Sequence, residues 1–182
     1  MLHILLATDA AFGIGNAGDL LFHIPADLKQ FRRLTTGQII VMGRKTLDSL
    51  PGGRALPKRD NIVLTRDVHF TRENITPVAD TPALLKALRT LDPHEEKEHY
   101  LIGGAGALRA LWPLCGKATL TVLRRTCDPV DTRIPNLDVS PDWMLESETD
   151  PVPFEETFYT VRTYRRLHTE SGARPLESSP FA

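Results

Sequence analysis

The sequence predicts an α/β fold with a mostly parallel central sheet and an antiparallel strand pair near its C-terminal end. Up to Leu111, short β-branched or leucine-rich runs alternate with segments of helical periodicity, a pattern typical of parallel strands connected through helices. Beyond Leu111 the alternation stops, and two longer strand-like segments, residues 118–123 and 154–164, flank a proline-bearing loop. We expect these two segments to pair antiparallel at one edge of the sheet.

The individual elements follow from these patterns in chain order. Apolar, β-branched runs predict strands over residues 2–8, 39–42, 61–64, 75–78 and 100–102. Helical spacing of apolar residues predicts helices over residues 25–34, 44–50, 81–91 and 105–111, and Pro25 suits the first helical position. The polar segment 168–182 is rich in serine, proline and glycine. We therefore expect one domain over residues 1–167 and a flexible C-terminal tail.

Composition and charge narrow the classes of function. The chain has 182 residues, 22 Lys and Arg, and 23 Asp and Glu, for a formal net charge of -1. Without a basic excess, binding to nucleic acid or to an anionic membrane is not expected. Cys115 and Cys127 form no C-x-x-C motif, and the N-terminus lacks the basic and apolar regions of a signal peptide. We therefore expect a cytoplasmic protein without a disulfide framework.

The first candidate site is the strand-to-helix junction in the stretch IIVMGRKTLDSL. Here Gly43 is followed by Arg44, Lys45 and Thr46 at a helix start, where free amides, two cations and a hydroxyl can hold phosphate. A solvated helix start is the alternative interpretation. The string is not a Walker loop, because five residues separate Gly37 from Gly43 and an arginine precedes the lysine.

Two further junctions carry suitable residues. In YLIGGAGALRALWP, a strand runs into Gly103, Gly104 and Gly106, which permit a close approach of backbone to a dinucleotide. Tight strand-helix packing explains these glycines equally well. In NIVLTR, Thr65 and Arg66 follow a strand, and the arginine suits a terminal phosphate, although arginines at strand ends are usually only solvated. All three junctions are expected at the carboxyl edge of the sheet, where open α/β folds bind ligands.

Asp27 is the most informative single residue. In HIPADLKQFRRL it precedes Phe31 and Leu34 at helical spacing, with Leu28 alongside, so a carboxylate lies on an apolar stripe. One interpretation is a charge that merely complements the helix dipole. The other is a buried acid that binds a polar heterocycle through two hydrogen bonds and takes part in proton transfer. No metal site is expected, because the histidines of HEEKEH are five residues apart and cannot share one ion on a helix.

Several stretches together resemble the bacterial type of the dihydrofolate reductase family over residues 1–167. These are IGNAGDLLFHIPADLKQFRRLT, IIVMGRKTLDSLPGGRALPKRDNIVLTR, YLIGGAGAL, LTVL, DTRIP and FYTVRTYRR, in the same order and spacing. The resemblance implies a three-layer fold with a central mixed sheet of eight strands. It also implies NADPH-dependent reduction of 7,8-dihydrofolate to tetrahydrofolate, with hydride transfer to C6 and protonation at N5. The implied partners are this substrate and antifolate inhibitors, and the expected state is a monomer.

The resemblance assigns expected roles to residues of the substrate side. Asp27 matches the acid that binds the pterin, Thr121 matches the hydroxyl bonded to it, and Arg59 matches the arginine that binds the glutamate α-carboxylate. The remaining matches are apolar positions lining the substrate cleft: Leu5, Ala7, Leu28, Phe31, Leu50, Leu56 and Ile102. Asp27, Phe22, Leu20 and Thr121 are the expected catalytic set.

The expected cofactor side is larger. The resemblance implies cofactor contacts at Ala7, Ile14, Leu20, Gly43, Arg44, Lys45, Thr46, Thr65, Arg66, Ile102, Gly103, Gly104, Ala105, Gly106, Ala107 and Leu108. Residues 9–24 match the mobile loop that closes over the nicotinamide, where a lid excludes water during hydride transfer.

Two positions depart from the family's pattern. Phe22 stands where the family usually has tryptophan, and Leu108 stands where it usually has an aromatic residue beside the nicotinamide. Phenylalanine cannot donate a hydrogen bond to an ordered water. Two alternatives stay open: the pyrimidine reductase of riboflavin synthesis, which shares the fold, and a pterin- or dinucleotide-binding module that lost catalysis through Phe22 and Leu108. Oxidation of NADPH with and without dihydrofolate separates the three.

Overall fold

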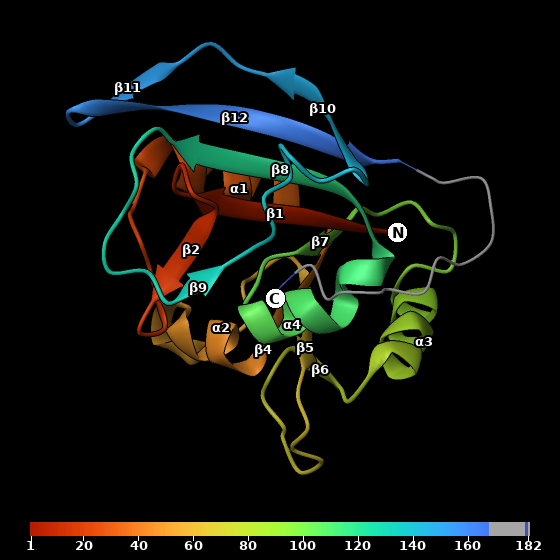
Figure 1. Ribbon diagram of the computed structural model, residues 1–182. Helices are drawn as coiled ribbons and strands as arrows, with labels where there is room; N and C mark the ends of the chain where they lie inside the picture. Colours follow the sequence, from red (N-terminus) through yellow and green to blue (C-terminus); the bar gives the residue numbers. More distant parts are fainter. Residues whose placement is uncertain (168–180, 182) are drawn as a thin grey trace.

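A computed structural model describes residues 1–167 and Phe181, which form a central sheet covered by helices on both faces (Figure 1). The described strands of this sheet are β1 (Leu2–Thr8), β4 (Ile39–Gly43), β5 (Asp60–Leu64), β6 (Ile75–Val78), β7 (His99–Leu101), β8 (Cys115–Leu123), β10 (Trp143–Glu148), β11 (Val152–Phe154) and β12 (Thr157–Arg166). They are arranged in the order β10-β12-β8-β1-β7-β4-β5-β6, with β11 pairing along β12. The expected mixed sheet with eight strand positions is confirmed.

The direction of the strands agrees with the sequence patterns. Pairs from β8 through β1, β7, β4 and β5 to β6 are parallel, whereas β8 and β12 pair antiparallel. The expected pairing of residues 118–123 with residues 154–164 is therefore confirmed. Its expected place at the edge is wrong, because β10 and β11 pair with the other side of β12. Only Trp143 of β10 is buried, so this strand shows no apolar alternation that predicts it.

The helices cover the sheet as two layers. They are α1 (Pro25–Thr35), α2 (Arg44–Ser49), α3 (Thr81–Leu91) and α4 (Ala105–Leu111), with 3-10 turns at Pro51–Gly53 and Trp112–Leu114. Buried residues of α3 and α4 join one core cluster, and residues of α1 and α2 join the other. Figure 1 shows α4 in front of the sheet and α1 behind it. The three-layer architecture is thus the one expected.

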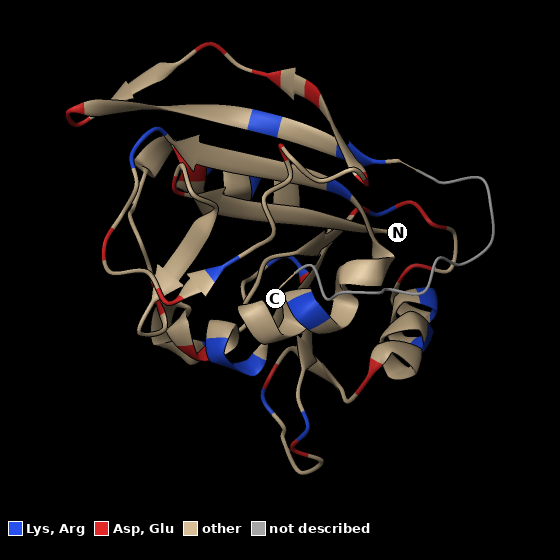
Figure 2. Ribbon diagram, viewed as in Figure 1, with Lys and Arg blue, Asp and Glu red and all other residues tan. Residues whose placement is uncertain are grey.

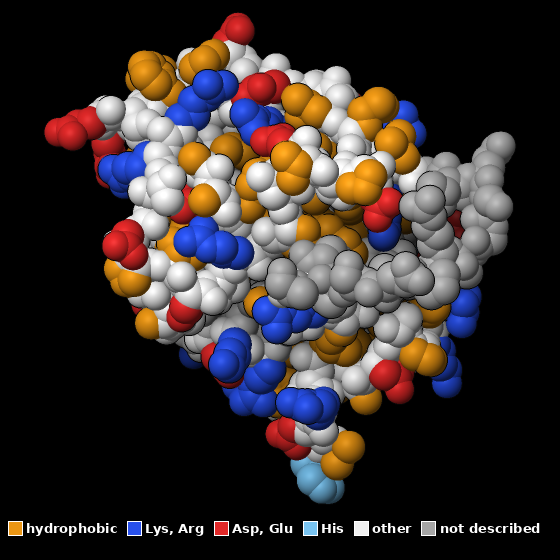
Figure 3. Space-filling view, viewed as in Figure 1, with side chains coloured by type: hydrophobic (Ala, Val, Ile, Leu, Met, Phe, Trp, Pro, Cys, Tyr) orange, Lys and Arg blue, Asp and Glu red, His pale blue; other side chains and the backbone are white. Residues whose placement is uncertain are grey.

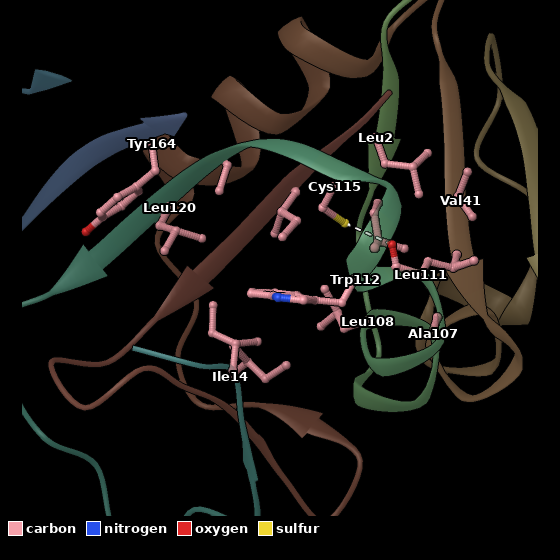
Figure 4. Close-up of a cluster of buried hydrophobic side chains, with 14 of the residues drawn as sticks. Leu2, Ile14, Val41, Ala107, Leu108, Leu111, Trp112, Cys115, Leu120 and Tyr164 are labelled. Carbon is pink, nitrogen blue, oxygen red and sulfur yellow. Dashed lines mark hydrogen bonds between the residues drawn. The ribbon is translucent and has the colours of Figure 1, made fainter. Parts of the chain in front are cut away.

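Strand β4 connects the two cores. Ile39 and Val41 belong to the cluster under α3 and α4, whereas Ile40 and Met42 belong to the cluster under α1 and α2. All four side chains are 0% exposed, which is typical of a central parallel strand. Each fully buried side chain of this kind stabilises the fold by about 1.5 to 3 kcal/mol. Figure 4 shows the α4 side of this core, where Leu108 and Trp112 lie among buried side chains.

A second, smaller sheet was not predicted. It joins β2 (Gly13–Asn16) to β3 (Asp19–Leu20) and to β9 (Thr132–Arg133) in the order β3-β2-β9. These strands are short and include glycines, so the sequence carries no strand signal there. The sheet ties the segment after β1 to the long connection after β8 (Figure 1).

The two cysteines and the lengths of the helices can be compared with the expectations from sequence. Both cysteines are free, and burial raises the pKa of the Cys115 thiol to about 12, so it stays protonated at neutral pH. None of the helices in the described part of the chain is long and apolar enough to cross a membrane. The expected flexible tail lies outside the described residues except for Phe181, whose ring packs at 5.1 Å from that of Trp112.

Tyr164 on β12 provides a test of how the antiparallel side is held. Its ring is 0% exposed, and its hydroxyl donates to Asp138 Oδ1 at 2.7 Å in the loop before β10. We expect Tyr164→Phe to lower the free energy of unfolding by about 1 kcal/mol, because a part-buried hydrogen bond is lost. Tyr159→Phe is the matched control, since its hydroxyl has no hydrogen-bond partner among the described residues. Urea unfolding of both variants measures the difference, and equal values would contradict the assigned role of this bond.

Candidate active site

A cleft of about 1240 Å³ opens at the carboxyl edge of the parallel strands. The ends of β1, β4 and β5 contribute Ala7, Gly43 and Leu64 to it, and Ile102 follows β7. Of the residues expected at the cofactor, it is lined by Ala7, Ile14, Leu20, Gly43, Arg44, Lys45, Thr46, Thr65, Arg66, Ile102, Gly104, Ala105, Gly106 and Ala107. The structure therefore brings the three strand-to-helix junctions together in one cleft.

The first two junctions are in direct contact. The amide of Gly43 donates to the carbonyl of Gly103 at 2.8 Å, which holds the start of α2 beside the start of α4. A Cβ at Gly104 would lie 3.1 Å from Thr46 Oγ1, so this position needs glycine or a shift of Thr46. No described side chain caps the first amides of either helix. Both sets of amides are consequently open to an anionic ligand in the cleft.

The cationic side chains at the cleft differ in how they are held. Arg44 Nε contacts both carboxylate oxygens of Asp48 at 3.1 to 3.2 Å, and its guanidinium stacks over Phe70 at 4.1 Å. Arg66 is exposed and makes no hydrogen bond or ion pair within the described chain. Lys and Arg side chains gather around α2 in the charge views (Figures 2 and 3). The guanidinium of Arg44 is thus held in place by its neighbours, whereas that of Arg66 is available to bind a ligand.

The carboxyl group of Asp27 lies on α1 and meets the sheet at β8. Its Oδ1 accepts a hydrogen bond of 2.5 Å from Thr121 Oγ1 on β8. In the parallel register, Thr121 lies opposite Ala7, which lines the cleft. Burial raises the pKa of Asp27, and the Thr121 hydrogen bond offsets this only in part. Among the described residues, Oδ2 accepts no hydrogen bond. A raised pKa and a free acceptor suit a group that binds a polar ligand.

An apolar wall adjoins Asp27 on the same face of the sheet. Five of the expected substrate-side residues pack together in the core cluster under α1 and α2: Leu5, Phe31, Leu50, Leu56 and Ile102. Leu28, also on α1, is 50% exposed. Asp27 therefore shares α1 with Phe31 of this apolar wall, and its carboxyl group meets β8 through Thr121.

Arg59 lies at the outer end of this wall, where it lines a second cavity of about 510 Å³ with Lys58 and Asn74. Its Nε donates to Thr35 Oγ1 at 2.8 Å, and Nη1 donates to the carbonyl of Pro57 at 2.6 Å. These contacts hold the guanidinium in one orientation, separate from the arginines around α2. The two ends of the site consequently carry independent positive charges.

The segment expected to form a lid borders the cleft. Leu20 and Ile14 line it, and Leu20 is 54% exposed. At the tip, the amide of Ala17 donates to Asp131 Oδ2 at 2.7 Å, from the connection after β8. Because Asp131 is exposed, this bond is accessible to water.

Among the described residues, the expected substrate-side residues other than Ala7 and Ile102 lie outside the cleft lining, and so do three further expected site residues. Gly103 is buried behind it, where its carbonyl meets Gly43. Phe22 packs against Ile24, Leu123 and Tyr159. Leu108 is 0% exposed, because α4 turns it into the core (Figure 4). The expected contact of Leu108 with the nicotinamide therefore stays a prediction, while the structure shows its side chain packed in the core.

Several cleft residues were missed by the sequence patterns. The main ones are polar or small residues, most of them in the short strands of the smaller sheet: Gly15, Asp19, Asp48, Asp131 and Thr132. Asp131 opens the stretch DTRIP that contributes to the resemblance, and this was the available signal. Asp48 was detectable only as a partner of Arg44 at i, i+4 on a helix.

Comparison with known proteins places this geometry in a family. The family model for dihydrofolate reductase matches residues 1–166. The dihydrofolate reductase of Haemophilus influenzae is 34% identical over 159 residues, covering 87% of this chain and 93% of that protein. That of Bacillus subtilis is 32% identical over 166 residues, covering 87% and 94%.

A solved structure supports the same assignment. Dihydrofolate reductase from Enterococcus faecalis complexed with NADP(H) and RAB-propyl superimposes with a TM-score of 0.74 at 28% identity, covering 91% of this chain and 96% of that chain. The family match spans almost the whole described chain, and the fold, the cleft and the acid on α1 occur in the expected places. This chain belongs to the dihydrofolate reductase family.

Proposed function

We propose that the protein reduces 7,8-dihydrofolate to 5,6,7,8-tetrahydrofolate with NADPH. The observation that carries the proposal is the part-buried Asp27 carboxylate, bonded to Thr121, which pairs with Ala7 at the border of a cleft of about 1240 Å³. A riboflavin-pathway reductase of the same fold has no evident use for this acid together with Arg59 at the far end of an apolar wall.

The residues of the large cleft fit a nicotinamide dinucleotide. The open amides of α2 and α4, with Thr46, Thr65 and Arg66, offer donors to phosphates, and Gly104 allows the backbone to approach closely. Ala7, Ile14 and Leu20 supply an apolar border for an uncharged ring. When bound, NADPH supplies the hydride that no side chain can donate.

Asp27 binds and polarises the pterin in this proposal. Thr121 fixes one carboxylate oxygen, so the other is left to accept from the amino group and N3 of the ring. An anion held there favours the protonated, electrophilic form of the substrate. Because Phe22 cannot donate a hydrogen bond and packs away from the cleft, the proton for N5 comes from water admitted beside Leu20.

Arg59 and the lid complete the proposed roles. The oriented Arg59 guanidinium binds the terminal carboxylate of the substrate by charge-assisted hydrogen bonds. Residues 9–24 close over the reacting rings and exclude water, and the exposed bond between Ala17 and Asp131 opens and closes with them.

One absorbance assay tests the activity. We expect the protein to oxidise NADPH when dihydrofolate is added and to leave NADPH unchanged without it. Oxidation that requires the riboflavin-pathway pyrimidine in place of dihydrofolate would identify the other reductase. Binding of both ligands without oxidation would identify a module that has lost catalysis.

Asp27→Asn tests the role of the acid in the reaction. The variant keeps the shape but loses the anion, so we expect kcat/KM for dihydrofolate to fall at least about 100-fold, the scale of a lost acid-base group. Asp80→Asn is the control, because Asp80 caps α3 by accepting from Ala83 N at 2.8 Å, away from the cleft. Equal, near-normal turnover by both variants at neutral pH would remove Asp27 from the mechanism.

The same variant tests the raised pKa of Asp27 through stability. Burial disfavours the ionised carboxylate in the folded state, so its pKa is higher there than in the unfolded chain. The ionised group therefore destabilises the ligand-free protein above its folded pKa, and this cost disappears below its unfolded pKa. We expect Asp27→Asn to be more stable than wild type at neutral pH, with the difference vanishing in acid. A loss of stability at neutral pH would instead support a charge that only complements the helix dipole.

Cofactor choice tests the arginines around α2. Charge-assisted hydrogen bonds to phosphate contribute about 1.5 to 3 kcal/mol each, so NADPH should be preferred over NADH. We expect Arg66→Ala to reduce this preference more than Arg44→Ala, because Arg44 is already engaged by Asp48. The double variant should lose most of it. The ratio of kcat/KM for the two cofactors is the measure, with the exposed Arg89 on α3 replaced by alanine as the control. If the double variant kept its full preference for NADPH over NADH, residues other than these two arginines would bind the distinguishing phosphate.

A further inference from the structure

Asp9 is a fully buried carboxylate for which the proposed reaction has no direct use. It follows the last residue of β1 and is 0% exposed. Its Oδ1 accepts hydrogen bonds from the amides of Ala11 at 2.9 Å and Gly13 at 2.7 Å. Its Oδ2 accepts from the amide of Cys127 at 2.9 Å. Arg133 Nη1 lies 4.0 Å from Oδ1, with a side chain that is 45% exposed. A buried charge in this setting is stabilised mainly by backbone donors.

These bonds join two segments that are distant in the sequence. Ala11 and Gly13 belong to the base of the lid segment, whereas Cys127 belongs to the connection between β8 and β9. Backbone bonds reinforce the joint, since Asp9 N donates to Gly13 O at 2.9 Å and Ala10 N donates to Arg125 O at 3.1 Å. The Asp9 side chain is therefore a three-way link between β1, the lid base and the neighbouring connection.

The packing at this joint leaves little freedom. A Cβ added at Gly13 would lie 2.8 Å from a methyl group of Val130, 3.0 Å from Asp9 Oδ1 and 3.1 Å from a methyl group of Leu21. A larger residue at position 13 would therefore displace the side chains of Val130, Asp9 and Leu21. The next residue, Ile14, lines the cleft, and Ala7 lines it two residues before Asp9. A shift of this joint consequently moves the apolar border of the cleft.

The lid segment thus has two carboxylate contacts of different kinds. Asp131 is exposed, and of the lid residues its carboxylate accepts a hydrogen bond from Ala17 at the tip, where water competes for the bond. Asp9 is buried and meets three amides at the base. Hydrogen bonds that water cannot reach open far less often than exposed ones.

We propose that Asp9 is a positioning residue that fixes the base of the lid, so that Ile14 and Ala7 hold the reacting rings at the distance that hydride transfer needs. The inference rests on the proposed reductase function. Asp9 touches neither ligand; it acts through the backbone of residues 11–13 and 127. Because small displacements of reacting groups reduce rates steeply, loss of this link lowers the chemical step rather than the affinity for substrate.

Asp9→Asn is the main test, with Asp92→Asn as the matched control. The asparagine oxygen still accepts from Ala11 and Gly13, but its amide group opposes the amide of Cys127, so one bond is lost. Asp92 is also a buried carboxylate, 5% exposed, that accepts from the amides of Glu96 and Lys97. It lies before the amino end of β7, at the opposite edge of the sheet from the cleft.

We expect both variants to lose stability in urea, but only Asp9→Asn to change catalysis. Its single-turnover rate of NADPH oxidation should fall at least about tenfold, with an unchanged dissociation constant for dihydrofolate, because misplacement of reacting groups affects chemistry first. Asp9→Ala, which removes all three bonds, should be slower still. Equal single-turnover rates in wild type, Asp9→Asn and Asp92→Asn would overturn the proposal.

A measurement on the wild-type protein without ligands separates this proposal from the proposed activity. Native-state hydrogen exchange should show the amides of Ala11, Gly13 and Cys127 exchanging together and much more slowly than the amide of Ala17. Exchange as fast as that of Ala17 would overturn the fixed base of the lid, whether or not any variant folds. Absence of dihydrofolate-dependent NADPH oxidation in wild type would instead overturn the proposed function, leaving this exchange result intact.

Discussion

The parallel register between β1 and β8 is the constraint on which the site depends. It places Thr121 opposite Ala7, so a hydroxyl group and a residue of the cleft border occupy neighbouring positions on adjacent strands. Asp27 reaches this hydroxyl from α1, which packs on the same face of the sheet. A slip of one residue would turn Thr121 to the opposite face and leave Asp27 without its donor. The acid and the cleft are therefore held together by backbone pairing rather than by a local motif.

The parallel half of the fold was predictable because its strands are buried on both faces and its helices are amphipathic. The apolar run that predicts residues 39–42 is the run whose side chains are 0% exposed in β4. The strands beyond this core were not predictable. β10 exposes almost every side chain, and β2, β3 and β9 are held by backbone pairing of short segments, so no apolar periodicity marks them.

The site was predictable where a chemically reactive residue occupies an unusual position in a local sequence pattern. A carboxylate on an apolar stripe identified Asp27, and its raised pKa follows from the same burial. Alignment with a family pattern could not predict the direction of Leu108, which the helix turns into the core. The role of Asp9 was not predicted because its hydrogen-bond donors are backbone amides. One of them, the amide of Cys127, lies 118 residues away along the chain. Long-range contacts of this type carry no local sequence signal.

The leucines beside the cleft have a consequence for the heat capacity of binding. Leu20 is 54% exposed and Leu28 is 50% exposed, so the protein without ligands keeps apolar surface in contact with water on both sides of the site. Any ligand that covers them removes this surface from water, which gives binding a negative heat-capacity change. The enthalpy of binding consequently becomes more favourable as temperature rises, while the entropy becomes less so. Ligand binding thus replaces the contact of leucine surface with water by contact with the ligand. Calorimetry at several temperatures measures the resulting heat-capacity change directly.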